Sequence, residues 1–315
     1  MTRPSIETRK LTKQFGSFTA LNGLDLKIEG AKCVGFLGPN GAGKTTTLKM
    51  LTDMIFPTSG ECFVNDIPVR KDRKSALAYC GVLIESPEIY PSLTPMEMLD
   101  MAGRLRGLAP ETRRARSEEV LAEVKMGDWA DKKVGKFSKG MKQRVNIAAT
   151  LLHDPQVLML DEPATGLDPR GMAEVRDIVR GLKKRNRLIF MSSHILPEVT
   201  DVCDEVALIN KGQLLFYDTL EAITRRFGDG HSTVDVAFAR NVSDSEMSGR
   251  IAAVKGVVGA ERLDARRIRL RFEGGVEEQS SICESVAALG LGLASFQESK
   301  SALEEIYLNQ IERGD

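Results

Sequence analysis

The 315-residue sequence is poor in aromatic residues and in cysteine, and it carries no net charge. Lysine plus arginine and aspartate plus glutamate each number 44, so nothing in the overall charge points to a nucleic-acid partner. No apolar run reaches about 18 residues, and residues 1–10 lack the apolar region of a secretion signal. The five cysteines have no metal-binding spacing. We therefore expect a chain without a membrane span, with reduced and mostly buried thiols, and long enough for one large core plus a small second domain.

A glycine-rich motif near the N-terminus is the strongest positive signal. Residues 38–45 read Gly-Pro-Asn-Gly-Ala-Gly-Lys-Thr and match G-x-x-x-x-G-K-[ST], a loop whose backbone N–H groups surround phosphates. The apolar stretch 33–37 predicts a buried strand before it and residues 44–52 a helix after it, a context that disfavours a chance glycine loop. Lys44 is expected at the β- and γ-phosphates and the Thr45 hydroxyl at Mg²⁺. The residues predicted to bind the nucleotide here are Gly38, Pro39, Asn40, Gly41, Ala42, Gly43, Lys44, Thr45 and Thr46.

Two adjacent carboxylates follow a second apolar stretch. Residues 157–160 are all apolar, which is typical of a strand covered on both faces of a parallel sheet, and Asp161 and Glu162 come directly after it. Ligands of open α/β sheets bind at this end of the strands. We expect Asp161 to belong to the Mg²⁺ site and Glu162 to act as general base on the attacking water. The alternative is that Glu162 merely caps the end of the strand.

A third motif identifies a family. Residues 137–144, Phe-Ser-Lys-Gly-Met-Lys-Gln-Arg, resemble the signature sequence of ATP-binding cassette (ABC) ATPases and lie upstream of the carboxylate pair, as in that family. Three further segments resemble family motifs in the same order. Phe15 stands where an aromatic ring stacks on adenine, residues 166–168 resemble the D-loop, and residues 192–194 resemble the segment that ends in the switch histidine. The resemblance covers about residues 5–218.

The resemblance implies both a fold and a domain organisation. The fold class is α/β, a P-loop NTPase with a RecA-like core, an antiparallel β-subdomain and an inserted helical subdomain at about residues 87–150. The ATPase domain is expected over residues 1–218. Period-two alternation at 20–28 and 61–69 fits the β-subdomain. Thr94, Pro95 and Glu97 predict a capped helix start, and 117–126 a second helix.

The resemblance also implies a mechanism that needs two chains. ATP lies between the P-loop of one chain and the signature of the other, so Ser138 and Gly140 are expected to contact the γ-phosphate in trans. Asp168 belongs to the same nucleotide site, and His194 is expected to contact the γ-phosphate after its buried strand. One complete motif set predicts a homodimer or pairing with a homologous ABC subunit, with ATP and Mg²⁺ as cofactors. His153 lacks such a context and is expected on the surface.

Two positions depart from the family pattern. Glu85 stands where the family has a glutamine; it could still ligate Mg²⁺ and take part in catalysis, but it adds a negative charge near the phosphates. Lys139 replaces a signature glycine and Met141 a glutamine. For Lys139, a place near the trans γ-phosphate and a place on the surface are equally acceptable interpretations.

Beyond a polar, glycine-containing linker at about 219–230, the pattern changes. Strand and helix signals in the order βαββαβ predict a small ferredoxin-like α+β domain over 219–315, and residues 301–304 predict the capping box of a final helix. Residues 303–308 are similar to the tail of ABC-2-type export ATPases. Arg267, Arg269 and Arg271 alternate with apolar residues and are interpreted as a solvated strand face.

These features support two functional hypotheses. The first is the ATP-hydrolysing subunit of an ABC transporter, favouring export, which lies on the cytoplasmic face of the membrane and uses separate integral membrane permease subunits. Residues 87–94, with Ile89, Tyr90 and Leu93, are the expected contact for those subunits. The alternative is a soluble ABC ATPase in translation or DNA maintenance, but neither a second cassette nor a long coiled-coil insertion is present.

Overall fold

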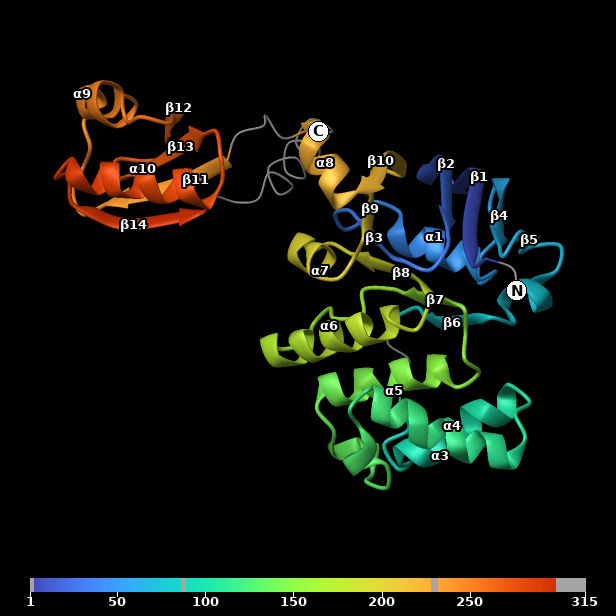
Figure 1. Cartoon of the computed structure of the whole chain (residues 1–315). Coiled ribbons are helices and arrows are strands. Elements are labelled where there is room, and N and C mark those ends of the chain that lie inside the picture. Colours follow the sequence, from blue (N-terminus) through green and yellow to red (C-terminus); the bar gives the residue numbers. More distant parts are fainter. Residues whose placement is uncertain (1–2, 86–88, 228–231, 299–315) are drawn as a thin grey trace. The chain divides into compact units, whose positions relative to one another are not determined.

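The computed structural model describes residues 3–85, 89–227 and 232–298 (Figure 1). These residues divide into two compact units, with the boundary between Leu220 and Glu221. Each unit has its own sheet and its own hydrophobic core. Among the described residues, none of the helices has the length and apolar character needed to cross a membrane.

The first unit is built around a six-stranded sheet. Its strands, in spatial order, are β10 (Gln213–Thr219), β9 (Glu205–Asn210), β3 (Cys33–Leu37), β8 (Leu188–Ser193), β7 (Val157–Leu160) and β6 (Cys80–Leu83). β9 and β10 form an antiparallel hairpin, and the other neighbours are parallel. β3, β7 and most of β8 are apolar and fully buried, as expected for strands covered on both faces. The carboxyl ends of β3, β6, β7 and β8 therefore meet at one edge of the sheet.

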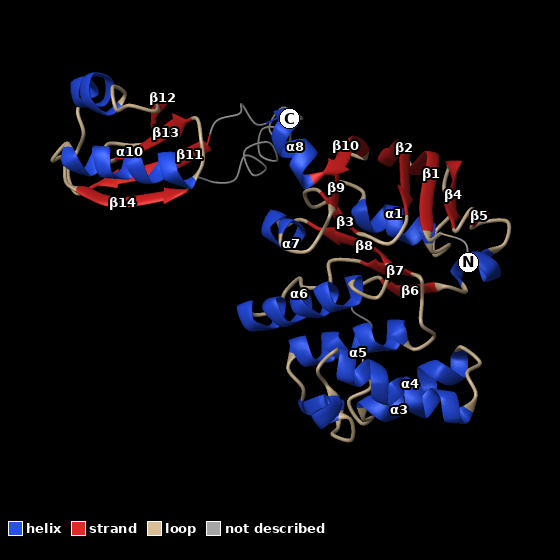
Figure 2. Cartoon of the chain, viewed as in Figure 1, coloured by secondary structure: helices blue, strands red, loops and turns tan. Residues whose placement is uncertain are grey.

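A second, antiparallel sheet packs against the first through a helix. It consists of β2 (Phe18–Glu29), β1 (Ser5–Phe15), β4 (Ser59–Val64) and β5 (Ile67–Pro68), in that order. The helix α1 (Lys44–Leu51) lies between the two sheets, where its Leu48 and Leu51 share one core with Leu24 of β2 and Phe36 of β3 (Figure 2). α1 is thus fixed on both sides, and with it the loop that precedes it. The short helix α2 (Arg73–Leu77) follows β5.

Helices cover the other face of the six-stranded sheet. α6 (Pro169–Lys183) connects β7 to β8, and α7 (Leu196–Thr200) follows β8 (Figure 1). α7 packs so closely on β3 that a methyl group on Gly35 would collide with Val199. A glycine in the buried strand therefore allows this close approach.

An insertion between β6 and β7 is helical, as expected. It contains α3 (Pro95–Leu105), α4 (Pro110–Glu123), the 3₁₀ turns η1 (Gly127–Trp129) and η2 (Val134–Lys136), and α5 (Lys139–Leu151). The predicted start of α3 is confirmed, because Thr94 and Glu97 form a reciprocal capping box and Pro95 is the first helical residue. The predicted start of α4 at residue 117 is wrong, since the helix begins at Pro110. Its N-cap is Ala109, which supplies no side-chain signal.

The second unit has the expected ferredoxin-like topology. Its sheet has the order β12 (Val257–Arg262), β13 (Arg267–Phe272), β11 (Ser232–Phe238) and β14 (Leu293–Glu298), all antiparallel. α9 (Asp244–Glu246), the π-helical turn η3 (Met247–Ile251) and α10 (Val276–Ala288) supply Ile251, Ile282 and Val286 to the core on one face. On the other face Arg269 donates two hydrogen bonds to Asp235 and Arg267 is exposed, which confirms a solvated strand face.

The segments before and after this sheet were expected to be a linker and a final helix. Residues 220–227 form the helix α8 (Leu220–Phe227), so the expected linker is wrong over this range: Ile223 is buried and supplies an apolar anchor that the polar neighbours obscured. The capping box expected at residues 301–304 and the export-ATPase-like tail at 303–308 lie outside the described residues.

All five cysteines are free thiols. Cys33, Cys62, Cys80 and Cys203 are buried, as expected, and Cys283 on α10 is half-buried. Burial raises the pKa of Cys62 and of Cys80 to about 12. Cys33 and Cys203 lie with their Sγ atoms 3.6 Å apart, and this contact together with burial raises the pKa of Cys203.

Candidate active site

The loop between β3 and α1 depends on its glycines. Gly43 adopts a φ of +104°, and a methyl group on it would lie 2.7 Å from the backbone oxygen of Ala20. A methyl group on Gly38 would collide with the backbone oxygen of Ile209. Only residues without a Cβ fit these two positions, so β2 and β9 pack directly against the loop backbone. No side chain caps the N-terminus of α1, so its first N–H groups remain available to an anion.

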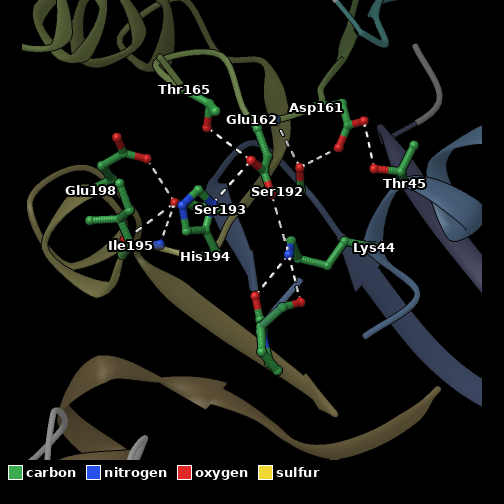
Figure 3. Close-up of polar contacts among 12 residues, drawn as sticks. Lys44, Thr45, Asp161, Glu162, Thr165, Ser192, Ser193, His194, Ile195 and Glu198 are labelled. Atoms are coloured by element: carbon green, nitrogen blue, oxygen red, sulfur yellow. Dashed lines mark hydrogen bonds and ion pairs between the residues drawn. The ribbon is translucent and has the colours of Figure 1, made fainter. Parts of the chain in front are cut away.

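Lys44, the first residue of α1, is buried against this loop, with 5% of its surface exposed. Its Nζ donates to the backbone oxygens of Gly38 at 2.8 Å and Pro39 at 3.0 Å. It also lies 3.3 Å from Oε1 of Glu162, which follows β7 (Figure 3). The lysine of the glycine-rich loop and the strand-end carboxylate are thus in one site, as the sequence predicts.

Thr45 and Asp161 form an oxygen-rich pair beside Lys44. The Thr45 hydroxyl donates to Oδ2 of Asp161 at 2.8 Å (Figure 3). Asp161 is buried at the end of β7, next to the first turn of α1. Hydroxyl and carboxylate oxygens are the ligands that Mg²⁺ takes, and Mg²⁺ needs only one or two protein ligands when phosphates and water supply the others. The residues present therefore fit a magnesium site.

Glu162 is held by three neighbours. His194 Nδ1 lies 3.0 Å from Oε2, and the Thr165 hydroxyl donates to the same oxygen at 2.9 Å. Because a carboxylate only accepts, Nδ1–H of His194 is the donor. Burial alone would raise the pKa of Glu162, but the Thr165 hydrogen bond and the electrostatic effect of Lys44 and His194 outweigh it and lower that pKa. The carboxylate is therefore ionised at neutral pH.

Two serines at the end of β8 complete the site, and the sequence assigned neither a role. Ser192 donates to Oδ1 of Asp161 at 2.6 Å and accepts a hydrogen bond from the backbone N–H of Glu162 at 2.9 Å. Ser193 donates to the buried Glu198 of α7 at 2.7 Å. The available signal was the strand order: once β7 and β8 are neighbours, the residue that follows Met191 must lie beside the residue that follows Leu160.

Glu85 lies outside the group of contacting residues around Asp161 and Glu162. It follows β6 with a φ of +57°, and its Oε1 accepts a hydrogen bond from Lys49 at 2.6 Å. Lys49 is one turn beyond Thr45 on α1, so the structure pairs the extra negative charge of Glu85 with a lysine. Among the described residues, the hydrogen-bond and ion-pair partner of Glu85 is Lys49 and not Thr45 or Asp161, so its role as a magnesium ligand stays a prediction.

One residue of the signature and one of the D-loop segment cap helices. Ser138 is the N-cap of α5 and accepts from the backbone N–H of Met141, and Asp168 is the N-cap of α6 and accepts from that of Gly171. A methyl group on Gly140 would lie 3.4 Å from the Cα of Gly171, so α5 and α6 are close to each other at these two glycines. Lys139 is exposed, with Nζ directly over Gly166 of the same chain.

The remaining predicted positions are less enclosed. Phe15, at the end of β1, is 50% exposed and has Lys13 Nζ 4.8 Å above its ring. Asn40 and Gly41 are exposed at the tip of the loop, whereas Ala42 is buried and Pro39 and Thr46 are half-buried. The structure thus places Thr45 in contact with Asp161, and Lys44 and His194 in contact with the adjacent Glu162.

The fold and the site match known proteins. The family model described as ABC transporter matches residues 21–165. The chain is 41% identical over 226 residues to the bacitracin transport ATP-binding protein BcrA of Bacillus licheniformis, covering 70% of this chain and 73% of that protein. It is 27% identical over 308 residues to the linearmycin resistance ATP-binding protein LnrL of Bacillus subtilis, covering 96% of this chain and 97% of that protein.

Solved structures of ATP-binding cassettes have the same fold as this chain. The ATP-binding subunit of an ABC transporter superposes with a TM-score of 0.63 at 28% identity, covering 71% of this chain and 93% of that chain. A dimeric ATP-binding cassette solved with ADP and Pi has a TM-score of 0.61 at 22% identity, which shows the shared fold. With the family model, the identity to relatives and the fold in agreement, the chain belongs to the ABC transporter family and is one of its ATP-binding, ATP-hydrolysing subunits.

Proposed function

We propose that this subunit binds Mg²⁺–ATP between two copies, or between itself and a homologous subunit, and hydrolyses it to drive export through separate membrane subunits. The observation that carries the proposal is the contact between Glu162 and Lys44, His194 and Thr165, beside the Thr45–Asp161 pair. Export is supported by the names of relatives, which include a bacitracin transport protein and a Nod factor export protein of Burkholderia lata. The transported substrate depends on the membrane subunit.

The phosphates are the part of ATP that this chain holds most directly. Lys44 exchanges its bonds with Gly38 and Pro39 for the β- and γ-phosphates, while the N–H groups of the loop and of the first turn of α1 face the same anion. Thr45 and Asp161 hold Mg²⁺, which neutralises part of the phosphate charge. Phe15 stacks on adenine, and its exposed ring is free to do so.

Glu162 supplies the base. Its lowered pKa keeps it ionised, so it can accept a proton from the attacking water as the bond between the γ-phosphorus and the bridging oxygen of ADP breaks. His194 and Thr165 hold the carboxylate in place by hydrogen bonds to one oxygen, which leaves Oε1 toward Lys44. Positioning and charge stabilisation carry most of the catalysis of phosphoryl transfer.

The second chain completes the site. Ser138 and Gly140 lie at the N-terminus of α5, a helix end suited to an anion, and we assign them to the γ-phosphate of the partner's ATP. Asp168, at the N-terminus of α6, lies in the same composite site. ATP then closes the pair, and loss of the γ-phosphate releases it.

The membrane subunits bind near residues 87–94, of which 87 and 88 lie outside the described residues, and the assembly lies on the cytoplasmic face of the membrane. Tyr90 is 59% exposed, while Ile89 and Leu93 are half-buried and support the segment. An exposed tyrosine on a segment held by half-buried apolar residues suits contact with an amphipathic helix of a partner. We assign residues 1–218 to the ATPase domain and 219–315 to an accessory domain.

Glu162→Gln tests the central role. We expect a loss of ATPase turnover by about 10²–10⁴-fold, because the amide cannot accept the proton, and a stable dimer with ATP by size-exclusion chromatography. The matched control Glu118→Gln makes the same change on the exposed face of α4 and should leave turnover unchanged. Unchanged turnover in Glu162→Gln would refute its role as base.

A further inference from the structure

Ser192 lies between the two carboxylates of the site and touches both residues. It is the fifth residue of β8, its surface is fully buried, and β8 is the direct parallel neighbour of β7. The register pairs Met191 with Leu160, so Ser192 stands level with the point where β7 ends and Asp161 begins. Its hydroxyl therefore faces the catalytic edge of the sheet (Figure 3).

The hydroxyl uses both of its hydrogen-bonding capacities in this position. Its one hydrogen is donated to Oδ1 of Asp161 at 2.6 Å, and its oxygen accepts the backbone N–H of Glu162 at 2.9 Å. Asp161 consequently has a separate partner for each oxygen, Ser192 for Oδ1 and Thr45 for Oδ2. With both oxygens bonded, the plane of the carboxylate cannot rotate freely.

The hydrogen bond that Ser192 accepts from the N–H of Glu162 constrains the backbone of Glu162. Glu162 has a φ of +44°, in the left-handed region that residues with a side chain rarely adopt. Such a conformation persists where the surroundings hold it. The N–H of Glu162 is tied to Ser192 while its side chain is tied to His194 and Thr165, so the residue is held at both ends.

We propose that Ser192 is a positioning residue for ATP hydrolysis, which orients Asp161 toward the magnesium site and Glu162 toward the attacking water. This inference rests on the roles given above to those two carboxylates. Ser193 provides the contrast within the same strand: it is equally buried, but its hydroxyl bonds Glu198 and the N–H of Ile195 instead. Partners that orient metal ligands commonly change metal affinity or activity by about 10–100-fold when removed.

Ser192→Ala is the direct test, with Mn²⁺ as the probe for the metal site. In the presence of a non-hydrolysable ATP analogue, we expect Mn²⁺ to bind about 10–100-fold more weakly by electron paramagnetic resonance, with a similar drop in kcat at limiting Mg²⁺. Affinity for the nucleotide without metal should stay within about twofold, because the described hydrogen bonds of the Ser192 hydroxyl go to Asp161 and Glu162 and not to the glycine-rich loop. The melting temperature is recorded alongside.

Thr150→Val is the matched control, since it also removes one buried hydroxyl, which within the described part of the chain donates to the backbone oxygen of Ile147 in α5. It should lower the melting temperature without weakening Mn²⁺ binding. Mn²⁺ affinity of Ser192→Ala within about twofold of the parent protein, or an equal loss in Thr150→Val, would overturn the proposal. If Ser192→Ala does not fold, Ser192→Cys keeps an unbranched side chain with a weaker donor, and wild-type-like Mn²⁺ affinity in that variant refutes it.

Failure of this inference and failure of the proposed function are distinguishable. A parent protein without Mg²⁺-dependent ATPase activity, or an active Glu162→Gln variant, contradicts the proposed function. Full activity and Mn²⁺ affinity in Ser192→Ala alone contradict only the positioning role.

Discussion

At the scale of single residues, the site is arranged so that charge is balanced locally. Lys44 is nearly fully buried, yet it has two backbone oxygens and one carboxylate within reach. A buried ammonium without such partners would be costly. Glu85 is balanced in the same way by Lys49, which the sequence could not reveal because the pair joins two elements 36 residues apart. The effect of Glu85 on the site therefore depends on a partner that only the fold supplies.

Gly43 and Gly41 give a prediction at this scale, because both have a positive φ in the same loop but differ in their surroundings. A methyl group on Gly43 would lie 2.7 Å from the backbone oxygen of Ala20, whereas one on Gly41 would meet nothing within 4 Å. We expect Gly43→Ala to lower the free energy of unfolding by about 2–4 kcal/mol and Gly41→Ala by about 1 kcal/mol. Urea denaturation without nucleotide measures both, and equal losses would contradict the steric argument.

At the scale of elements, α5 and β6 are joined by His153. It follows the end of α5, and its Nε2–H donates to the backbone oxygen of Cys80, the first residue of β6, at 3.0 Å. The expected surface position of His153 is wrong, because the ring is half-buried and its Nδ1 has no hydrogen-bond partner among the described residues. Burial and the nearby charge of Arg106 lower the pKa of His153 to about 4.

This lowered pKa predicts a loss of stability in mild acid. Between pH 6.5 and 4 the unfolded chain binds a proton at His153 and the folded chain does not, so stability falls as pH falls through this window. His153→Gln keeps an N–H donor but cannot titrate. From pH 7 to pH 5 we expect the parent protein to lose about 1 kcal/mol more than this variant, after allowance for the partial exposure of the ring. Urea unfolding at the two pH values measures it, and parallel losses would contradict the prediction.

The elements themselves were predictable to different degrees. The strands that end at Leu37 and Leu160 carry continuous apolar runs, and the start of α3 carries a full capping box, so local sequence defined them well. The start of α4 has proline at its first position but an alanine N-cap, and in α8 the buried Ile223 stands among polar neighbours, so the local signals for both helices were weaker. The role of Ser192 depends on the register of two strands 31 residues apart, which no local pattern encodes.

At the scale of the whole molecule, the chain carries two units with separate cores, and the relatives cover them unequally. The solved cassette covers 71% of the chain, whereas LnrL covers 96% of it and therefore both units. The expected order βαββαβ of the second unit was readable because two of its strands, β11 and β13, alternate strictly, as in Val234, Val236 and Phe238. The alternative function in translation or DNA maintenance is set aside, because the chain belongs to the ABC transporter family.

The proposed membrane partner gives a prediction at this scale. A tagged chain extracted with its native membranes in mild detergent should co-purify with a polytopic membrane protein in stoichiometric amount. Tyr90→Asp should lower the recovery of that protein by about tenfold or more, because it places a charge at an exposed aromatic contact. Val258→Asp, on the second unit, is the control for a charge at an exposed apolar position. A parent chain found only in the soluble fraction would contradict the proposal.

The distribution of thiols has a practical consequence for experiments on the intact protein. Four of the five cysteines are buried in the first unit, and those at positions 62, 80 and 203 have raised pKa values, so little reactive thiolate forms there. Cys283, on α10 of the second unit, is the accessible one of the five. A maleimide fluorophore should therefore label the natural sequence at one known position, without cysteine replacement. Its emission would follow the accessory unit during the ATPase cycle, while every residue of the nucleotide site remains native.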